Sequence, residues 1–444
     1  MRKYQQLALL LVSCFSIGVL LMYKSENNRL KYVLKYVNFF GRNDAAVLRR
    51  MHNKTEDDQK LFVSALSKPL PVWQLIGDNF HAYSAFWNRN ELVAGGDAQV
   101  LVVGNQGAVV DFRCSFDVGG RKVQGKFRFQ RDSTESVIDD KSSTFTNYIF
   151  FCQVSRNFGH PEYVSFSDIT APIKRQVKLR LRHLRPQNVP DKPHTLKATP
   201  TTAPVKVRLP ATICVDLVNF NMSSHYAHNV DALLQFFLFH QALGVEHFMV
   251  YNYDVLPEQV VLILQRTNMH LYALPFNFPF EQINATTRLR QILQSDCLLR
   301  NLNYAAFTML LKPNELIYPS SHFIGKLSMQ NQLRHYATEI SRFELATFAV
   351  CFDEHKKLLL DNVQYDPEVK SAYKLFLYRL ELPPAQLLLP KATSVELPLS
   401  NGFAHRYGDC QNVGHDGLHD WRNGLRQDLM DHIDSLRDEV DLLI

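Results

Sequence analysis

A short polar segment, Lys312-Pro313-Asn314-Glu315, directly follows the apolar run from Ala305 to Leu311. The run predicts a buried strand, and polar side chains at the end of a buried strand are placed to bind a ligand. The Asn314 amide could offer one neutral oxygen to a divalent cation, whereas a lysine ammonium repels a cation and binds a phosphate group as a point charge. The segment therefore predicts a metal site, a phosphate site, or the remnant of one.

Two other stretches offer groups for acid–base chemistry. Asp353 lies in a short charged run, while Asp409 and Asp416 lie in the polar stretch that begins at residue 401. A carboxylate within hydrogen-bond reach of a hydroxyl can remove its proton, and Arg406 in the same stretch can bind a phosphate. The three aspartates are candidate bases, and the alternative for each is a loop residue that faces water.

The sequence contains no signature of several common active sites. It has no P-loop, no dinucleotide fingerprint, no G-x-S-x-G, no H-E-x-x-H and no C-x-x-C, so these enzyme and zinc-site classes have no support. The 49 basic residues exceed the 43 acidic ones by only six. So small and diffuse an excess gives no reason to expect a nucleic acid as partner.

The elements that must position these residues alternate in type along residues 211–444. Strand-like runs at 211–220, 245–254 and 269–276 are separated by helical patterns at 230–244 and 257–268. Alternating strands and helices predict an α/β domain with a largely parallel sheet, in which ligands bind beyond the carboxyl ends of the strands.

The preceding part of the chain has a different pattern. Residues 69–185 consist of short apolar runs separated by Gly, Asn and Asp, which predicts a β-rich accessory domain. Residues 186–210 are rich in Pro and Thr and predict a linker. Cys114 and Cys152 lie in neighbouring strand-like runs of the β-rich region, and we expect them to form a disulfide.

The N-terminus predicts a membrane anchor. Arg2 and Lys3 precede an uninterrupted apolar run at residues 7–23, which is long enough to span a bilayer and has no clear cleavage site. We therefore expect a cytoplasmic tail at 1–6, a stem at 24–68 and a lumenal body. Six cysteines beyond the anchor suit an oxidising compartment. Sequons for N-glycosylation in the secretory lumen occur at Asn53, Asn221 and Asn284.

Three segments of residues 211–444 carry a family resemblance. They are "ICVDLVNF", "LLQFFLFHQALGVEHFMVYNYD" and "QILQSDCLLRNLNYAAFTMLLKPNELIYP". Their succession resembles glycosyltransferase family 92, from about Ala211 to the C-terminus. The strongest matches are the run from Gly244 to Phe248, the pair Tyr251-Asn252, and Asp296-Cys297 with Arg300.

The resemblance implies a GT-A-like domain that transfers a hexose from a nucleotide sugar, such as UDP-galactose, to a glycan with inversion. The layout of an anchor, a stem and a lumenal α/β domain is separately the one expected of a single-pass type II protein of the Golgi membrane with its catalytic domain in the lumen. The family's metal would be Mn²⁺ or Mg²⁺. Residues implied to bind the donor are Lys312, Asn314, Glu315, Asp296 and Arg406. Glu315 and His405 are the candidate metal ligands.

The sequence departs from the family pattern at two places. Lys312 and Asn314 occupy the positions of two aspartates, and Gln235 and Leu238 occupy positions that often carry glutamate. A lysine repels a divalent cation, so metal dependence is left open. In one reading the Lys312 ammonium lies against the donor diphosphate and replaces part of the metal's charge. In the other, the site has decayed, and the chain is a non-catalytic relative that binds a glycan or escorts another transferase.

Overall fold

The computed structural model describes most of the chain beyond residue 68. The described residues are 69–90, 95–131, 144–155, 159–171, 176–184, 209–220, 229–264, 267, 269–280, 286–319, 336–337, 339–353, 355–366, 374–380, 393–408, 419–422, 431, 434, 437 and 438. All the described residues belong to one compact unit, Leu66–Ile444.

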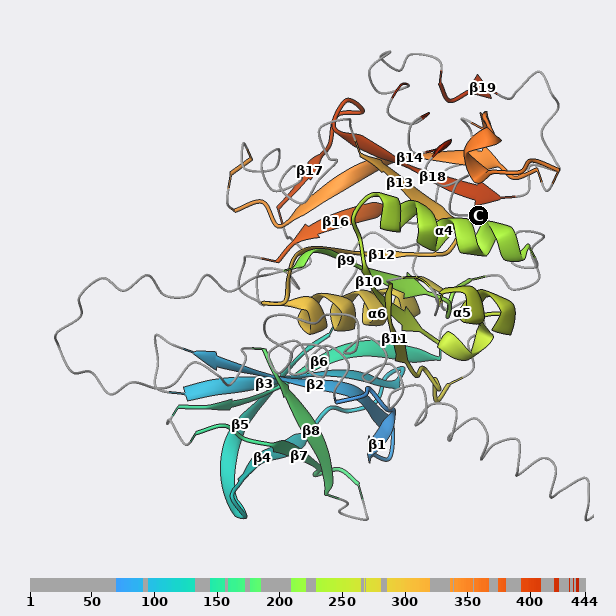
Figure 1. Ribbon diagram of the computed structural model, residues 1–444. Coiled ribbons are helices and arrows are strands. Elements are labelled where there is room, and N and C mark those ends of the chain that lie inside the picture. Colours follow the sequence, from blue (N-terminus) through green and yellow to red (C-terminus); the bar gives the residue numbers. More distant parts are fainter. Residues whose placement is uncertain are drawn as a thin grey trace, which may run out of the picture. The chain divides into compact units, whose positions relative to one another are not determined.

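The first sheet is closed on itself (Figure 1). It contains β1 (Gln74–Gly77), β2 (Phe80–Asn90), β3 (Gly95–Asn105), β4 (Phe112–Val118), β5 (Arg121–Arg131), β6 (Phe145–Val154), β7 (Tyr163–Asp168) and β8 (Val177–His183). The strand order is β1-β2-β3-β6-β5-β4-β7-β8, and a parallel pairing of β2 with β8 completes the closure. Alternate side chains point inward, where Phe80, Phe112, Phe150 and Phe166 form an aromatic core. The β-rich character expected of residues 69–185 is observed.

The second sheet combines parallel and antiparallel strands. Its members are β9 (Leu209–Asp216), β10 (His247–Tyr251), β11 (His270–Leu274), β12 (Ala305–Leu311), β13 (Glu315–Pro319), β14 (Arg342–Cys351), β15 (Gln364–Asp366), β16 (Leu375–Arg379), β17 (Ser394–Glu396), β18 (Gly402–Gly408) and β19 (His419–Asp420). The main path runs β11-β10-β9-β12-β16-β14-β15-β19, while β18 pairs with both β13 and β14. The pairings among β11, β10, β9 and β12 are parallel, so their carboxyl ends lie at one edge.

The α-helices of this region whose bounds are given number three. They are α4 (Val230–Ala242), α5 (Glu258–Leu264) and α6 (Thr286–Asn301), with 3₁₀ turns at Tyr253–Val255 and Leu359–Asp361. The Asn229 side chain caps α4 by accepting the Ala232 N–H, and Gly244 adopts the left-handed conformation just beyond the helix. Helix α6 lies between the two sheets, because it contacts β9 and β12 on one side and β3 and β6 on the other (Figure 1).

Two disulfides fix neighbouring elements. Cys114–Cys152 joins β4 to β6 across β5, which confirms the expected pairing. Gly125 of β5 lies under this bridge, where a Cβ would approach the Cys152 sulfur to 2.3 Å. The second disulfide, Cys214–Cys297, ties β9 to α6 and was not predicted from the sequence.

The structure also qualifies the expected architecture. Strands outnumber helices in the described residues, so the chain is richer in β-structure than the α/β expectation implied. The two sheets lie in one compact unit, although the composition of residues 186–210 predicts a linker between two domains.

Other expectations concern residues that are not described. These are the tail at 1–6, the anchor at 7–23, the stem at 24–68, nearly all of 186–210, and the sequons at Asn53, Asn221 and Asn284. Among the helices that are described, none is long and apolar enough to cross a membrane. The expectations for the undescribed residues remain predictions.

Candidate functional site

The candidate site lies at the carboxyl ends of the adjacent parallel strands β9 and β12. Val215 of β9 pairs with Leu311 of β12. Asp216 therefore ends one strand where Lys312 leaves the other. The neighbouring strand β10 brings Tyr251 into register with Asp216. This is the edge at which sheets of this type bind ligands.

A tight turn holds the segment that follows β12. The Glu315 N–H donates to the Lys312 carbonyl at 2.9 Å, and Pro313 occupies the second position of the turn, which its fixed φ favours. The Glu315 carboxylate also accepts a hydrogen bond from the Lys312 N–H at 2.9 Å, so two hydrogen bonds join Lys312 and Glu315 across the turn. Asn314 donates through Nδ2 to the Tyr407 carbonyl at 2.6 Å, and its buried Oδ1 has no hydrogen-bond partner in the structure.

Glu315 is the anionic centre of the site. Its side chain is fully buried, and Oε1 accepts a hydrogen bond from Arg406 Nε at 2.9 Å. The strand pairing explains this contact, because Glu315 of β13 and Arg406 of β18 are directly opposite each other. On the other side, Arg290 Nη2 lies 3.6 Å from Glu315 Oε2. Glu315 thus holds two guanidinium groups in place.

Arg290 of α6 links this centre to β9 and β12. Its Nη1 lies 3.2 Å from Asp216 Oδ2, and its Nη2 donates to the Leu310 carbonyl at 2.7 Å. Asp216 is fully buried and also accepts hydrogen bonds from the backbone and side chain of Asn219. A helix residue and two strand ends are therefore joined through charge-assisted bonds, which are the stronger kind.

The site carries an excess of positive charge. Lys312, Arg290 and Arg406 are cationic, against the carboxylates of Asp216 and Glu315. Burial lowers the pKa of Lys312; Asp216 and Glu315 oppose this shift, and Arg290 and Arg406 add to it. Lys312 is half-buried, and its ammonium is subject to the charges of Asp216, Glu315, Arg290 and Arg406, which does not fit the alternative of a freely solvated lysine. Such an environment suits an anionic ligand.

The residues around Glu315 do not fit a divalent cation. Both Glu315 oxygens bind protein donors, and Lys312 places a positive charge at the same turn. His405 points to the face opposite Arg406, because successive strand residues alternate, and its ring packs against Tyr318 and Trp421. Glu315 and His405 therefore do not form a shared metal site. Within the described ranges, no group of three His, Cys, Asp or Glu could hold a metal.

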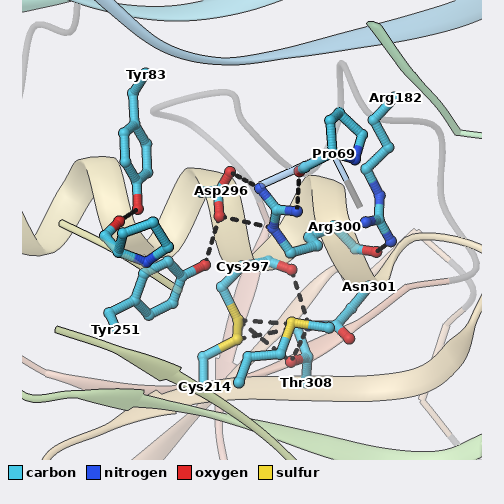
Figure 2. Close-up of polar contacts among 12 residues, drawn as sticks. Pro69, Tyr83, Arg182, Cys214, Tyr251, Asp296, Cys297, Arg300, Asn301 and Thr308 are labelled. Carbon is cyan, nitrogen blue, oxygen red and sulfur yellow. Dashed lines mark hydrogen bonds and ion pairs between the residues drawn. A yellow bond between two sulfur atoms is a disulfide. The ribbon is translucent and has the colours of Figure 1, made fainter. Parts of the chain in front are cut away.

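Asp296, expected to contact the donor, has described contacts within α6 and with β10, and a role in donor binding stays a prediction. It is fully buried on α6, where Arg300 Nε and Nη2 donate to its two oxygens at 2.9 and 3.0 Å, and Tyr251 Oη donates at 2.7 Å (Figure 2). Burial raises the pKa of Asp296, but the Arg300 guanidinium and these hydrogen bonds outweigh it and lower the pKa overall. Its observed role is to hold Arg300, which donates to the Pro69 carbonyl at 3.2 Å.

No described contact brings the expected bases to this cluster. Asp353 is exposed in the turn after β14, where it accepts the His355 N–H. Asp409 and Asp416 lie outside the described residues, although Asp409 follows Arg406 by three positions. Their role as bases remains a prediction.

Gln235 on α4 has a structural use. Its Nε2 donates to the Lys357 carbonyl at 2.9 Å, and its Oε1 accepts the Leu359 N–H at 2.6 Å. The amide supplies both a donor and an acceptor, whereas an ionised glutamate only accepts and would lose the bond to the Lys357 carbonyl. The amide therefore has a structural role at a position where the resemblance led us to expect glutamate.

Sequence reasoning missed Asp216 and Arg290. The signal for Asp216 was available, because it ends the strand-like core of "ATICVDLVNF", where a polar residue marks the ligand-binding edge. Arg290 gives no comparable signal, since its role depends on the packing of α6 against both strand ends.

The fold and the cluster define a protein with buried, paired charges and an excess of one positive charge at the carboxyl ends of parallel strands. The comparison with family models is specific: residues 210–373 match glycosyltransferase family 92. The matched region contains Asp216, Arg290, Lys312 and Glu315, and the match supports membership of this family. Membership indicates a glycosyltransferase, which implies a nucleotide-sugar donor and a glycan acceptor.

Two further comparisons add little. No curated protein matches the chain. Among solved structures, the 4-diphosphocytidyl-2C-methyl-D-erythritol synthase from Anaerococcus prevotii is similar at 9% identity and a TM-score of 0.24, covering 52% of this chain and 96% of that one. A likeness this weak supports no statement about fold or activity.

Proposed function

We propose that this protein transfers a hexose from a nucleotide sugar, such as UDP-galactose, to a glycan, with inversion at the anomeric carbon. The observation that carries this proposal is Lys312, half-buried among Asp216, Glu315, Arg290 and Arg406 at the strand ends. The family match supplies the reaction class, and the charge excess supplies the means of binding a diphosphate.

The chemistry needs positive charge beside the leaving diphosphate. When the bond from the anomeric carbon to the diphosphate oxygen breaks, negative charge grows on the nucleotide product. A preorganised ammonium at Lys312 stabilises that charge without reorganising water. Arg290 and Arg406 are held by carboxylates, so they fix the field around the lysine. In this proposal the cationic side chains supply the positive charge that a metal held by an acidic pair supplies in the family pattern.

The proposed domain is GT-A-like, and four parallel strands followed by antiparallel strands support it. The base that deprotonates the acceptor hydroxyl is proposed to be Asp409 or Asp416. The chain leaves β18 at Gly408, two residues after Arg406 reaches the site, which favours Asp409.

The proposed location is the Golgi lumen, behind the anchor at residues 7–23. Every cysteine among the described residues is disulfide-bonded: Cys114, Cys152, Cys214, Cys297 and Cys351. Disulfides persist in oxidising compartments and are rare in the cytosol, which supports a secretory location.

A second candidate function is a non-catalytic relative that binds a glycan or escorts another transferase. Gln235 favours it, because its amide clamps the backbone at Lys357 and Leu359 where the family often has glutamate. This candidate predicts glycan binding without release of nucleotide.

The test is release of UDP from UDP-hexoses by the purified full chain, with and without glycan acceptors. The matched variants are Lys312→Ala and Lys178→Ala, the latter removing an exposed lysine of the closed sheet. We expect UDP release by the wild type and by Lys178→Ala, and its loss in Lys312→Ala. No release from any donor, together with no UDP binding, contradicts the proposed activity.

A further inference from the structure

The end of α6 nearest the site is fastened to the closed sheet. Asn147 of β6 donates through Nδ2 to the Arg288 carbonyl at 2.8 Å and to Gln291 Oε1 at 3.3 Å. Arg288 donates in return to the Phe145 carbonyl, also on β6. Asn147 is 6% exposed, so these bonds form away from water, where losing a partner is costly.

Arg290 lies between the two residues of α6 that Asn147 contacts. Its guanidinium bonds to Asp216 and to the Leu310 carbonyl, and lies beside Glu315. Arg290 lies within the first turns of α6, so a displacement of these turns moves Arg290 relative to both strand ends. A displacement of about 1 Å is enough to weaken a positioned site.

We infer that Asn147 is a positioning residue for the donor site, acting through the first turns of α6 on Arg290. The closed sheet thereby helps to set the geometry of the nucleotide site. This inference rests on the proposed function, because it assigns Asn147 to the binding of the donor diphosphate.

The segment before α6 is held in the same way. Tyr83 Oη of β2 donates to the Pro275 carbonyl at 2.9 Å, just beyond the carboxyl end of β11. Phe145 packs edge-on against Phe278, with ring centroids 4.8 Å apart, and stacks on Phe280. The closed sheet therefore also contacts the segment that leads from β11 towards α6.

The opposite end of α6 offers a matched control. Asn303 follows the helix and donates through Nδ2 to the Leu184 carbonyl of the closed sheet at 2.6 Å. Its φ is 68°, so Asn303→Gly removes the side-chain bond while keeping a backbone that glycine adopts readily. The Asn147 and Asn303 bonds thus both connect the region of α6 to the first part of the chain, but only the residues that Asn147 contacts, Arg288 and Gln291, flank Arg290 in the sequence.

The experiment measures thermal unfolding and the UDP dissociation constant of the full chain. We expect both Asn147→Ala and Asn303→Gly to lower the unfolding temperature. UDP affinity should fall by about fivefold or more in Asn147→Ala and stay at the wild-type value in Asn303→Gly. Gln291→Leu, a milder change at the same contact, should also weaken UDP binding. It replaces Asn147→Ala as the test if that variant does not fold.

Two results overturn the inference. Wild-type UDP affinity in both Asn147→Ala and Gln291→Leu shows that the contact does not position the site. Equal weakening in Asn147→Ala and Asn303→Gly shows a general loss of structure instead. Both results leave the proposed function intact, whereas a wild-type chain that binds no UDP contradicts the proposed function and this inference together.

Discussion

Glu315 and Arg406 form an ion pair, with Arg406 Nε 2.9 Å from Glu315 Oε1, across two antiparallel strands. The carboxylate is fully buried, and a second guanidinium, that of Arg290, lies 3.6 Å from its other oxygen. This arrangement makes Glu315 the residue that assembles the positive charge of the site. Its removal therefore leaves buried cations uncompensated.

Glu315→Gln should lower the free energy of unfolding by about 3–5 kcal/mol, the usual cost of breaking a buried ion pair from one side. Denaturant unfolding of the full chain measures this change. The control is Glu246→Gln, because Glu246 is exposed and its substitution should change stability by less than about 0.5 kcal/mol. Equal effects of the two substitutions would show that the ion pairs of Glu315 contribute no net stability.

UDP binding should weaken as the pH rises, and it should do so below the ordinary lysine pKa of 10.5. Burial lowers the pKa of Lys312 in the free protein, so the ammonium that binds the diphosphate is lost earlier than in an exposed lysine. Calorimetric titration across neutral and alkaline pH measures the affinity. Lys312→Arg keeps its charge and should remove this dependence; an unchanged pH profile in that variant argues against Lys312 as the titrating group.

Asp296→Asn should destabilise the protein by about 3–5 kcal/mol, because Arg300 would keep a buried charge without its partner. The lowered pKa of Asp296 means that its contribution is present above the unfolded value and is lost as pH falls towards the folded one. The free energy of unfolding should therefore fall less steeply with decreasing pH in the variant than in the wild type. Asp254→Asn is the exposed control. If the folded Asp296→Asn protein loses UDP affinity while its stability is unchanged, Asp296 is a donor ligand after all.

Gln235→Glu should lower the free energy of unfolding by about 1–3 kcal/mol without increasing activity. The new carboxylate would face the Lys357 carbonyl, to which the amide now donates at 2.9 Å. Thermal unfolding and UDP-release assays check the two parts of this prediction. A gain of transfer activity in Gln235→Glu would show that the position retains the role that glutamate has in the family.

Much of the strand and helix pattern was predictable, because periodicity reports which side chains are buried. The alternation at residues 211–276 corresponds to β9, α4, β10, α5 and β11. The turn at Lys312-Pro313-Asn314-Glu315 was also readable as a polar strand exit. The electrostatics of this turn were not predictable, since they depend on how α6 packs Arg290 against the turn and on Arg406, which is 91 residues away from Glu315 in sequence.

The assignment of Asp296 shows the limit of motif reasoning. The motif placed it near the donor, but its environment depends on the closed sheet, which lies outside the resemblance. Its partner Arg300 bonds to Pro69, at a separation of 231 residues. No local pattern encodes such a contact.

The central claim is that Lys312 takes the place of a metal at the diphosphate. Its most direct test is the UDP dissociation constant of the full chain by calorimetry, in EDTA and in Mn²⁺, for the wild type and for Lys312→Ala. We expect the same affinity in both conditions and a loss of about 10-fold to 100-fold in Lys312→Ala, as for a charge-assisted bond. Binding that requires Mn²⁺, or that survives Lys312→Ala unchanged, would contradict the claim.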